Sequence, residues 1–181
     1  TFFSSAVSAV TWTKAPLAEA AKEFHQVLNL MFQSGAIVPF RFPTIMQTDE
    51  ELKSHLKENA DKYRVWLSEF QNDVQMEALI SYPGESLAAS APSGAAYLKE
   101  KQRRQTELEQ VADTVKLSVA TLTKDWRQRT VQQGIRCFAL LERASVTEFN
   151  TLMRSLRVPG NVSVRVNGPW HVAEFLESRK P

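Results

Sequence analysis

The sequence predicts an α+β protein made of two small domains that are joined through a long helix. Apolar residues recur every three or four positions in some segments, which is typical of amphipathic helices, and alternate in others, which is typical of strands. A stretch rich in Ser, Ala and Gly, residues 85–96, interrupts both patterns. We therefore expect an N-terminal α+β domain at 1–84, a linker at 85–92 and a C-terminal α+β domain at 93–181.

The first domain is expected to open with a strand and a helix. Phe2–Trp12 is small, apolar and β-branched, as in strands. Pro16 occupies a position that a first helical turn tolerates, and the amphipathic helix that follows should stop before Gly35. The apolar face of this helix is expected to comprise Leu17, Ala20, Ala21, Phe24, Val27, Leu28 and Met31. Ala36–Phe42 is then expected to form a short strand. Because Pro39 lacks an amide donor, that strand should lie at an edge or a bulge.

A second helix and a third strand complete this domain. Thr48 and Glu51 form a capping box at the start of a helix that is expected to continue to Phe70. Val74–Tyr82 alternates between apolar and polar residues, which predicts a half-buried strand. The expected order is therefore strand, helix, strand, helix, strand.

The second domain should begin with the long helix, for which Ser93 is the candidate cap. From Leu108 to Trp126 the apolar residues keep a three-four spacing, which predicts a packed helical face. Lys99–Glu107 contains no apolar residue, so this part of the helix should project into solvent or toward a partner.

The rest of the second domain is expected to be a strand, a helix and a strand. Gly134–Arg143 predicts a strand buried on both faces, residues 146–156 a short amphipathic helix, and residues 162–166 a final alternating strand. Together with the long helix, this order is consistent with half of a ferredoxin-like arrangement.

Composition excludes several classes of function. With 43% hydrophobic and 23% charged residues the chain resembles an ordinary globular protein rather than a disordered one. Its single cysteine, Cys137, cannot form an internal disulfide and fits a reducing cytoplasm. The apolar runs are too short to span a lipid membrane. A net charge of +2, spread along the chain, is too weak for nucleic-acid binding.

No enzymatic constellation emerges from the sequence. The histidines occur singly, without metal-ligand spacing, at His25, His55 and His171. Cys137 lies among apolar residues, where a thiol is usually inert. The glycines form no phosphate-binding motif, and the acidic run at Asp49–Glu51 is explained by the dipole of the helix that it starts. We therefore expect no catalytic residue, no metal and no cofactor, and thus a protein that is not an enzyme.

The segment Ala-Ile-Val-Pro-Phe-Arg-Phe-Pro-Thr at 36–44 is followed by an acidic helix start. With three further motifs, this segment resembles the gas vesicle protein F/L family (GvpF/GvpL), whose signature at this place is V-L-P-L-R-F-G-T. The matching residues are Pro39, Arg41, Phe42 and Thr44, whereas Pro43 replaces the usual glycine. Ser93–Leu98 resembles the G-x-x-Y-L entry to the family's long helix, and Gly168-Pro169-Trp170 resembles its closing G-P-W. Ala6–Ser8, ahead of a proline, also fits.

This resemblance implies a non-enzymatic, cytoplasmic accessory protein, associated with the gas vesicle and acting in gas vesicle shell assembly. The implied partners are the major shell protein and other minor gas vesicle proteins, without a cofactor. It implies two α+β domains, at least one of them ferredoxin-like. The family begins with a further strand that has no counterpart before Thr1, so we expect that first strand to be missing.

The candidate partner-binding residues are those that carry the motifs, Pro39, Arg41, Phe42, Gly168, Pro169 and Trp170. Each has a structural alternative. Arg41 either forms an ion pair that orients the next helix or contacts a partner, and Trp170 either covers the final sheet or lies at an interface. An alternative function is a ferredoxin-like regulatory module that binds a small ligand in a deep apolar pocket.

Overall fold

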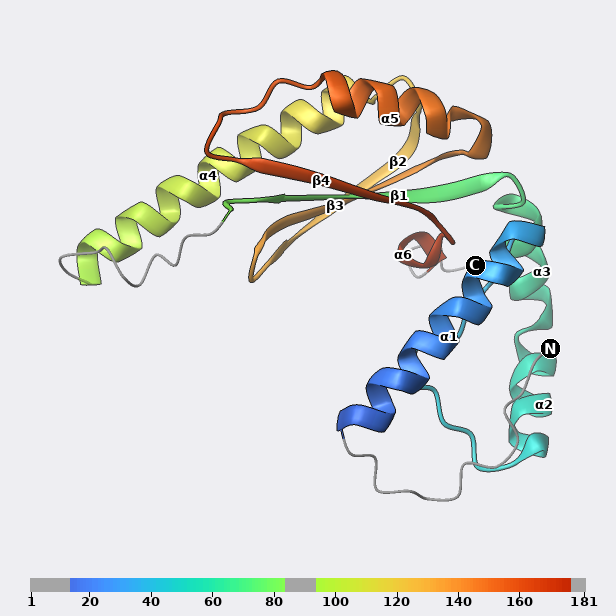
Figure 1. The fold of residues 1–181 in the computed structure, drawn as a ribbon. Coiled ribbons are helices and arrows are strands. Elements are labelled where there is room, and N and C mark those ends of the chain that lie inside the picture. Colours follow the sequence, from blue (N-terminus) through green and yellow to red (C-terminus); the bar gives the residue numbers. More distant parts are fainter. Residues whose placement is uncertain (1–13, 84–93, 177–181) are drawn as a thin grey trace.

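The computed structural model describes residues 14–83 and 94–176 (Figure 1). The expected strand at Phe2–Trp12 and the expected linker at 85–92 lie outside these residues. In chain order the elements are α1 (Lys14–Ser34), α2 (Asp49–Glu58), α3 (Ala60–Glu69), β1 (Asp73–Ser81), α4 (Gly94–Ser118), β2 (Thr123–Val131), β3 (Gly134–Glu142), η2 (Arg143–Ser145), α5 (Val146–Ser155), β4 (Ser163–Trp170) and α6 (Ala173–Leu176).

The strands form a single four-stranded sheet in the order β2-β3-β1-β4, and all neighbours are antiparallel. β1 lies inside this sheet, between β3 and β4, although the sequence analysis assigned it to the first domain. The β1 residues are buried on both faces of the sheet, including the polar residues Gln75 and Ser81. The alternating pattern suggested only one buried face, so it did not indicate a central strand.

The main core lies between the sheet and two helices on one of its faces, α4 and α5 (Figure 1). Alternate residues of β1 and β3 point into it, since successive strand side chains face opposite sides. The residues at its centre come from β1, β3, α4 and α5. They are Val74, Met76, Ile80, Val111, Val115, Ile135, Cys137, Leu141 and Phe149. Phe32, near the end of α1, also joins this core.

A smaller apolar cluster covers part of the opposite face. It joins Phe138 and Leu140 of β3 to Trp66 and Phe70, at the end of α3, and to the segment around α6, which contributes Val172, Phe175 and Leu176. Through Phe32 and this cluster, the helices that precede β1 are attached to the sheet. In Figure 1, α1, α2 and α3 extend away from one end of the sheet.

The predicted strand at Ala36–Phe42 is wrong, because this segment is irregular in the structure. Pro39 and Pro43 cannot donate backbone hydrogen bonds, so a regular ladder is disfavoured. Ile37 packs against the main core and Val38 against the smaller cluster. The apolar residues Ile37 and Val38 thus belong to an irregular connection between α1 and α2 that packs against both clusters.

The long helix also ends earlier than predicted, at Ser118, whereas the predicted helical face continued to Trp126. A turn follows, in which the amide of Leu122 donates to the carbonyl of Val119 at 3.0 Å, and the chain continues as β2. Leu122 and Trp126 do pack against the main core, but from the turn and the strand. β2 is a polar edge strand, so its residues carry little apolar alternation that would have identified it.

Other elements agree with the sequence analysis. α1, β1, β3, α5 and β4 lie where helices and strands were expected, and β3 is buried on both faces. Thr48 does cap the predicted helix, since the amide of Glu51 donates to its hydroxyl at 3.1 Å, while the Glu51 carboxylate accepts from the amide of Gln47 at 2.8 Å. The helix that it starts, however, divides at Asn59 into α2 and α3. The Asn59 side chain donates to the carbonyl of His55 there, which ends α2.

Candidate functional site

The predicted partner-binding segment around Arg41 lies between α1 and α2. Phe42 packs its ring against Phe24 of α1, with 5.3 Å between the ring centroids. Phe40 packs in the same way against His55 of α2, at 5.7 Å. Pro39 is half-buried and Arg41 is exposed. Aromatic contacts with the two helices therefore position this segment, in place of the strand pairing that was expected.

Phe42 continues an exposed apolar row on α1. Val27, Leu30 and Met31 are 43%, 65% and 36% exposed, and Phe42 is 38% exposed. Residues three and four positions apart share one side of a helix, so Val27, Leu30 and Met31 are neighbours, and Phe24 connects them to Phe42. We call Val27, Leu30, Met31 and Phe42 the α1 apolar stripe. The adjoining side of α1 is the buried one, with Leu28 and Phe32.

The second predicted segment, Gly168-Pro169-Trp170, ends β4. Gly168 has a φ of +123°, and a Cβ atom there would lie 3.0 Å from the carbonyl oxygen of Gln75 and 2.9 Å from the sulfur of Met76. Trp170 is half-buried and lies opposite Gln75, beside an irregularity in the β1–β4 pairing. Glycine is therefore required for the close approach of β4 to β1.

The structure does not combine the two predicted segments into one site. Phe42 contacts α1, whereas Gly168 and Trp170 contact β1. Figure 1 shows the connection between α1 and α2 running away from the sheet that contains β4. Of the six predicted residues, Phe42 belongs to an exposed apolar surface, while Gly168 has a clear structural role.

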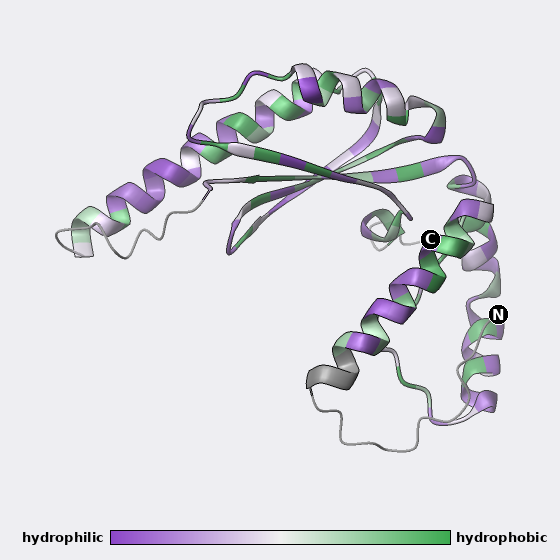
Figure 2. Cartoon of the chain, viewed as in Figure 1, coloured by the Kyte–Doolittle hydropathy of each residue, from purple (hydrophilic) through white to green (hydrophobic). Residues whose placement is uncertain are grey.

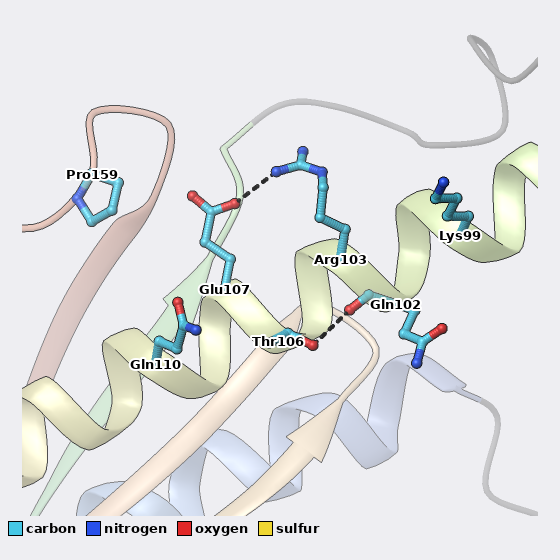
Figure 3. Close-up of a pocket in the computed structure, with 7 residues that line it drawn as sticks. All are labelled: Lys99, Gln102, Arg103, Thr106, Glu107, Gln110 and Pro159. Carbon is cyan, nitrogen blue, oxygen red and sulfur yellow. Dashed lines mark hydrogen bonds and ion pairs between the residues drawn. The ribbon is translucent and has the colours of Figure 1, made fainter.

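A polar hollow of about 600 Å³ lies along α4 (Figure 3). Most of its lining comes from successive turns of α4 and the rest from Pro159, so the lining is Lys99, Gln102, Arg103, Thr106, Glu107, Gln110 and Pro159. In Figure 3 the Arg103 guanidinium points toward the Glu107 carboxylate, and the two form an ion pair at 3.3 Å. Figure 2 shows that α4 is mostly hydrophilic where it extends past the sheet.

Hydrogen bonds beside this hollow attach α4 to the end of β1. The Tyr82 hydroxyl donates to Glu107 at 2.5 Å, and the Asn161 amide donates to the same carboxylate at 3.1 Å. Burial first, and then the Glu107 carboxylate, raise the pKa of Tyr82 to about 12. The Tyr82 hydrogen bond is the main cause that lowers the pKa of Glu107. Arg104 also stacks over the Tyr82 ring at 4.9 Å.

The expectation that Lys99–Glu107 projects from the protein therefore holds only for part of this stretch. Lys99 and Lys101 are exposed, but Arg104 and Glu107 face Tyr82. The charged groups in this network neutralise one another, and Arg103 and Arg104 both bind Glu100. This network attaches α4 to Tyr82 and Asn161, and it places no nucleophile beside a base.

The groups most often used in catalysis or metal binding are positioned as packing residues. Cys137 is buried, and burial raises its pKa to about 12, which disfavours the reactive thiolate. His55 pairs with the Tyr63 hydroxyl at 2.8 Å. Within residues 14–83 and 94–176, no group of three or more His, Cys, Asp or Glu side chains could hold a metal ion. No described helix is long and apolar enough to cross a membrane.

The α1 apolar stripe was not predicted, because Val27 and Met31 share helical spacing with Leu28 and were expected on one buried face with it. A signal was present in the density of apolar residues between Val27 and Phe32, where only Asn29 is polar. One buried face cannot hold all of these residues, since consecutive helical positions point about 100° apart. The surplus therefore indicates a second apolar face.

Comparisons with known proteins agree with the motifs. The sequence matches the family described as gas vesicle synthesis protein GvpL/GvpF over residues 2–177. A search by sequence among curated proteins finds no significant match.

Two solved structures have a similar fold. The crystal structure of GvpF from Anabaena sp. PCC7120 matches with a TM-score of 0.66 at 13% identity, over 86% of this chain and 73% of that chain. The crystal structure of GvpF from Microcystis aeruginosa matches with a TM-score of 0.60 at 12% identity, over 84% of this chain and 75% of that chain. Since the family match spans almost the whole sequence, the chain belongs to the GvpL/GvpF family of gas vesicle synthesis proteins.

Proposed function

We propose that this protein is a non-enzymatic accessory protein of gas vesicle shell assembly that binds the major shell protein through the α1 apolar stripe. Membership of the gas vesicle family supports the process. The single observation that carries the binding surface is the exposure of Val27, Leu30, Met31 and Phe42 side by side. Exposed apolar residues that are grouped, rather than scattered, are typical of protein–protein interfaces.

The chemistry of the stripe fits this partner. Shell subunits are expected to be hydrophobic and to aggregate before they assemble, so an accessory protein needs an apolar surface of its own. Met31 adds a flexible side chain that can adapt to different partner surfaces. Other minor gas vesicle proteins are proposed as further partners, in the cytoplasm and on the vesicle.

A ferredoxin-like architecture is part of the proposal. The chain order β1-α4-β2-β3-α5-β4, with the antiparallel sheet order β2-β3-β1-β4, supports such a module. Both helices of this unit lie on one face of the sheet, where they contribute to the main core. This unit would serve as the rigid base from which α1 presents the stripe, because Phe32 of α1 inserts into that core.

The alternative function as a small-ligand module lacks a specific observation in its favour. It requires a deep, apolar pocket with a few convergent polar groups. The hollow along α4 is lined by polar side chains apart from Pro159, and two of its charged groups, Arg103 and Glu107, are paired with each other. We therefore retain shell assembly as the proposed function.

Co-purification with the major shell protein tests the proposed surface. Leu30 is 65% exposed, so Leu30→Glu should leave the fold intact while placing a charge in the interface. We expect the recovered shell protein to fall by about tenfold or more, as for a residue at the centre of an interface.

Leu117→Glu is the matched control, because Leu117 is 76% exposed but lies on α4, away from the stripe. It should recover as much shell protein as the wild type. Circular dichroism melts of both variants establish that they are folded. Equal recovery with Leu30→Glu and the wild type would exclude the α1 apolar stripe as the binding surface.

A further inference from the structure

Three arginines form one row across the sheet, on the face opposite α4 and α5. The strand pairing places Arg129 of β2 opposite Arg136 of β3, Arg136 opposite Leu79 of β1, and Leu79 opposite Arg165 of β4. Residues opposite each other in an antiparallel pair point to the same face, so the four side chains share it. The core-facing neighbours Ile80 and Ile135 point the other way.

Two members of this row are expected to destabilise the sheet. Like charges directly opposite each other on neighbouring strands are destabilising, and Arg129 and Arg136 form such a pair. The position of β2 at an edge would allow almost any polar residue there. Local choices that oppose folding are expected at functional sites, where binding compensates for them.

The carboxylates nearby neutralise only part of this charge. Arg129 binds Glu174 with two hydrogen bonds, at 2.9 and 3.1 Å. Arg136 reaches Glu77 at 3.4 Å, but its buried Nε atom has no hydrogen-bond partner. Arg165 is exposed, and no ion pair involves it in the part of the chain that the structure describes.

We propose that this arginine row, Arg129, Arg136 and Arg165, is a second interaction surface that binds an acidic segment of a partner protein. Guanidinium groups bind carboxylates through two parallel hydrogen bonds, so a row of them matches a polypeptide with repeated Asp or Glu. The row is separate from the α1 apolar stripe and does not depend on the shell protein as partner.

An acidic polypeptide fits this surface better than a nucleic acid does. Binding of single-stranded nucleic acid uses exposed aromatic side chains on which bases stack. Phe138, the aromatic residue of β3 that lies beside this row, is 3% exposed and is covered by the Arg129 guanidinium at 4.8 Å from the ring centroid.

Fluorescence anisotropy with labelled peptides tests this proposal on the full chain. The probes are an oligoglutamate peptide, an oligoglutamine peptide of the same length, and an oligouridine of the same length. We expect the wild type to bind oligoglutamate most tightly, and more weakly as salt increases. Arg165→Gln should weaken this binding about threefold, and Arg129→Gln with Arg165→Gln about tenfold, because each exposed ion pair contributes modestly.

Lys99→Gln combined with Lys101→Gln is the matched control, since it removes two exposed cations from α4. An equal loss of binding in this control would show that only overall charge matters and would overturn the proposal. Binding of oligoglutamate no tighter than oligoglutamine would also overturn it, as would tighter binding of oligouridine that the same arginines support. Leu30→Glu should bind oligoglutamate like the wild type, which separates this test from that of the proposed function.

Discussion

The sheet with α4 and α5 and the helical region before β1 differ in how completely they bury their apolar residues. In the sheet unit, several core side chains are 0% exposed, namely Val74, Ile80, Val115 and Leu141. In the helical region Phe70, which follows α3, is 2% exposed, but the best-buried side chains within α1, α2 and α3 retain more exposure, at 6% for Phe32, 8% for Leu52 and 9% for Trp66. That region also carries the exposed α1 apolar stripe.

This difference separates a part that holds the fold from a part that leaves an apolar surface exposed. A closed core, with helices on one face of a paired sheet, needs no partner to be stable. When a partner covers an apolar face that the described residues leave exposed, the burial of that face stabilises the complex. The sheet unit is therefore expected to respond to mutations through stability, and the helical region through local opening and binding.

The largest effect is expected in the sheet unit, at the turn between β2 and β3. Gly134 has a φ of +144°, and a Cβ atom there would lie 2.0 Å from the carbonyl oxygen of Ile80. Gly134→Ala should therefore lower the free energy of unfolding by about 3 kcal/mol or more, as measured by chemical denaturation. Gly160→Ala is the control, because nothing lies within 4 Å of its added Cβ. Similar stability of both variants would contradict this account of the turn.

A smaller and local effect is expected where α1 meets the sheet. Arg143 stacks on the Phe32 ring at 4.4 Å and also donates to the carbonyl of Phe32 at 3.3 Å. Phe32→Leu removes the ring but keeps apolar bulk, so it should cost about 1 to 2 kcal/mol. Hydrogen exchange should show faster opening of α1 than of β3. Equal changes in both would mean that α1 does not open separately from the sheet.

The smallest effect should appear as a pH dependence of the same junction. His171 lies edge-on to Phe32, with 6.4 Å between the ring centroids, and its Nδ1 atom is buried without a hydrogen-bond partner. Burial first, and then the charge of His25, lower its pKa below 6.5. The unfolded state therefore binds the proton more readily, so the contribution to stability is present above pH 6.5 and is lost as the pH falls below that value.

Denaturation midpoints at pH 8 and pH 5 (about one and a half units on either side of that value) would measure this dependence. The wild type should lose more stability on acidification than His171→Asn, in which the titrating group is absent. An identical loss in both proteins would show that other groups dominate the acid response.

The candidate site was only partly predictable from the sequence. The motif around Arg41 led to Phe42, which does belong to an exposed apolar surface, but Val27 and Met31 were assigned to the buried side of α1. A helical repeat indicates which residues share a side, not which side faces a partner element. Gly168 was selected as a partner contact, yet its close approach to Gln75 depends on pairing between strands that are far apart in sequence.

The sequence by itself determined the elements whose patterns are local. α1, β1, β3 and α5 follow from apolar periodicity, the start of α2 follows from its capping box, and the family follows from short motifs in a fixed order. These features depend on neighbouring residues, so one chain segment contains enough information to predict them.

Only the tertiary structure decided the features that depend on distant partners. β2 is a strand because β3 offers it a hydrogen-bonding edge. In Ala36–Phe42, Ile37 and Val38 pack against two different clusters instead of pairing with a strand. The row of Arg129, Arg136 and Arg165 exists only through the register of four strands, since these residues are not adjacent in the chain. Register is set by the whole sheet, and a shift of one residue would place each side chain on the other face.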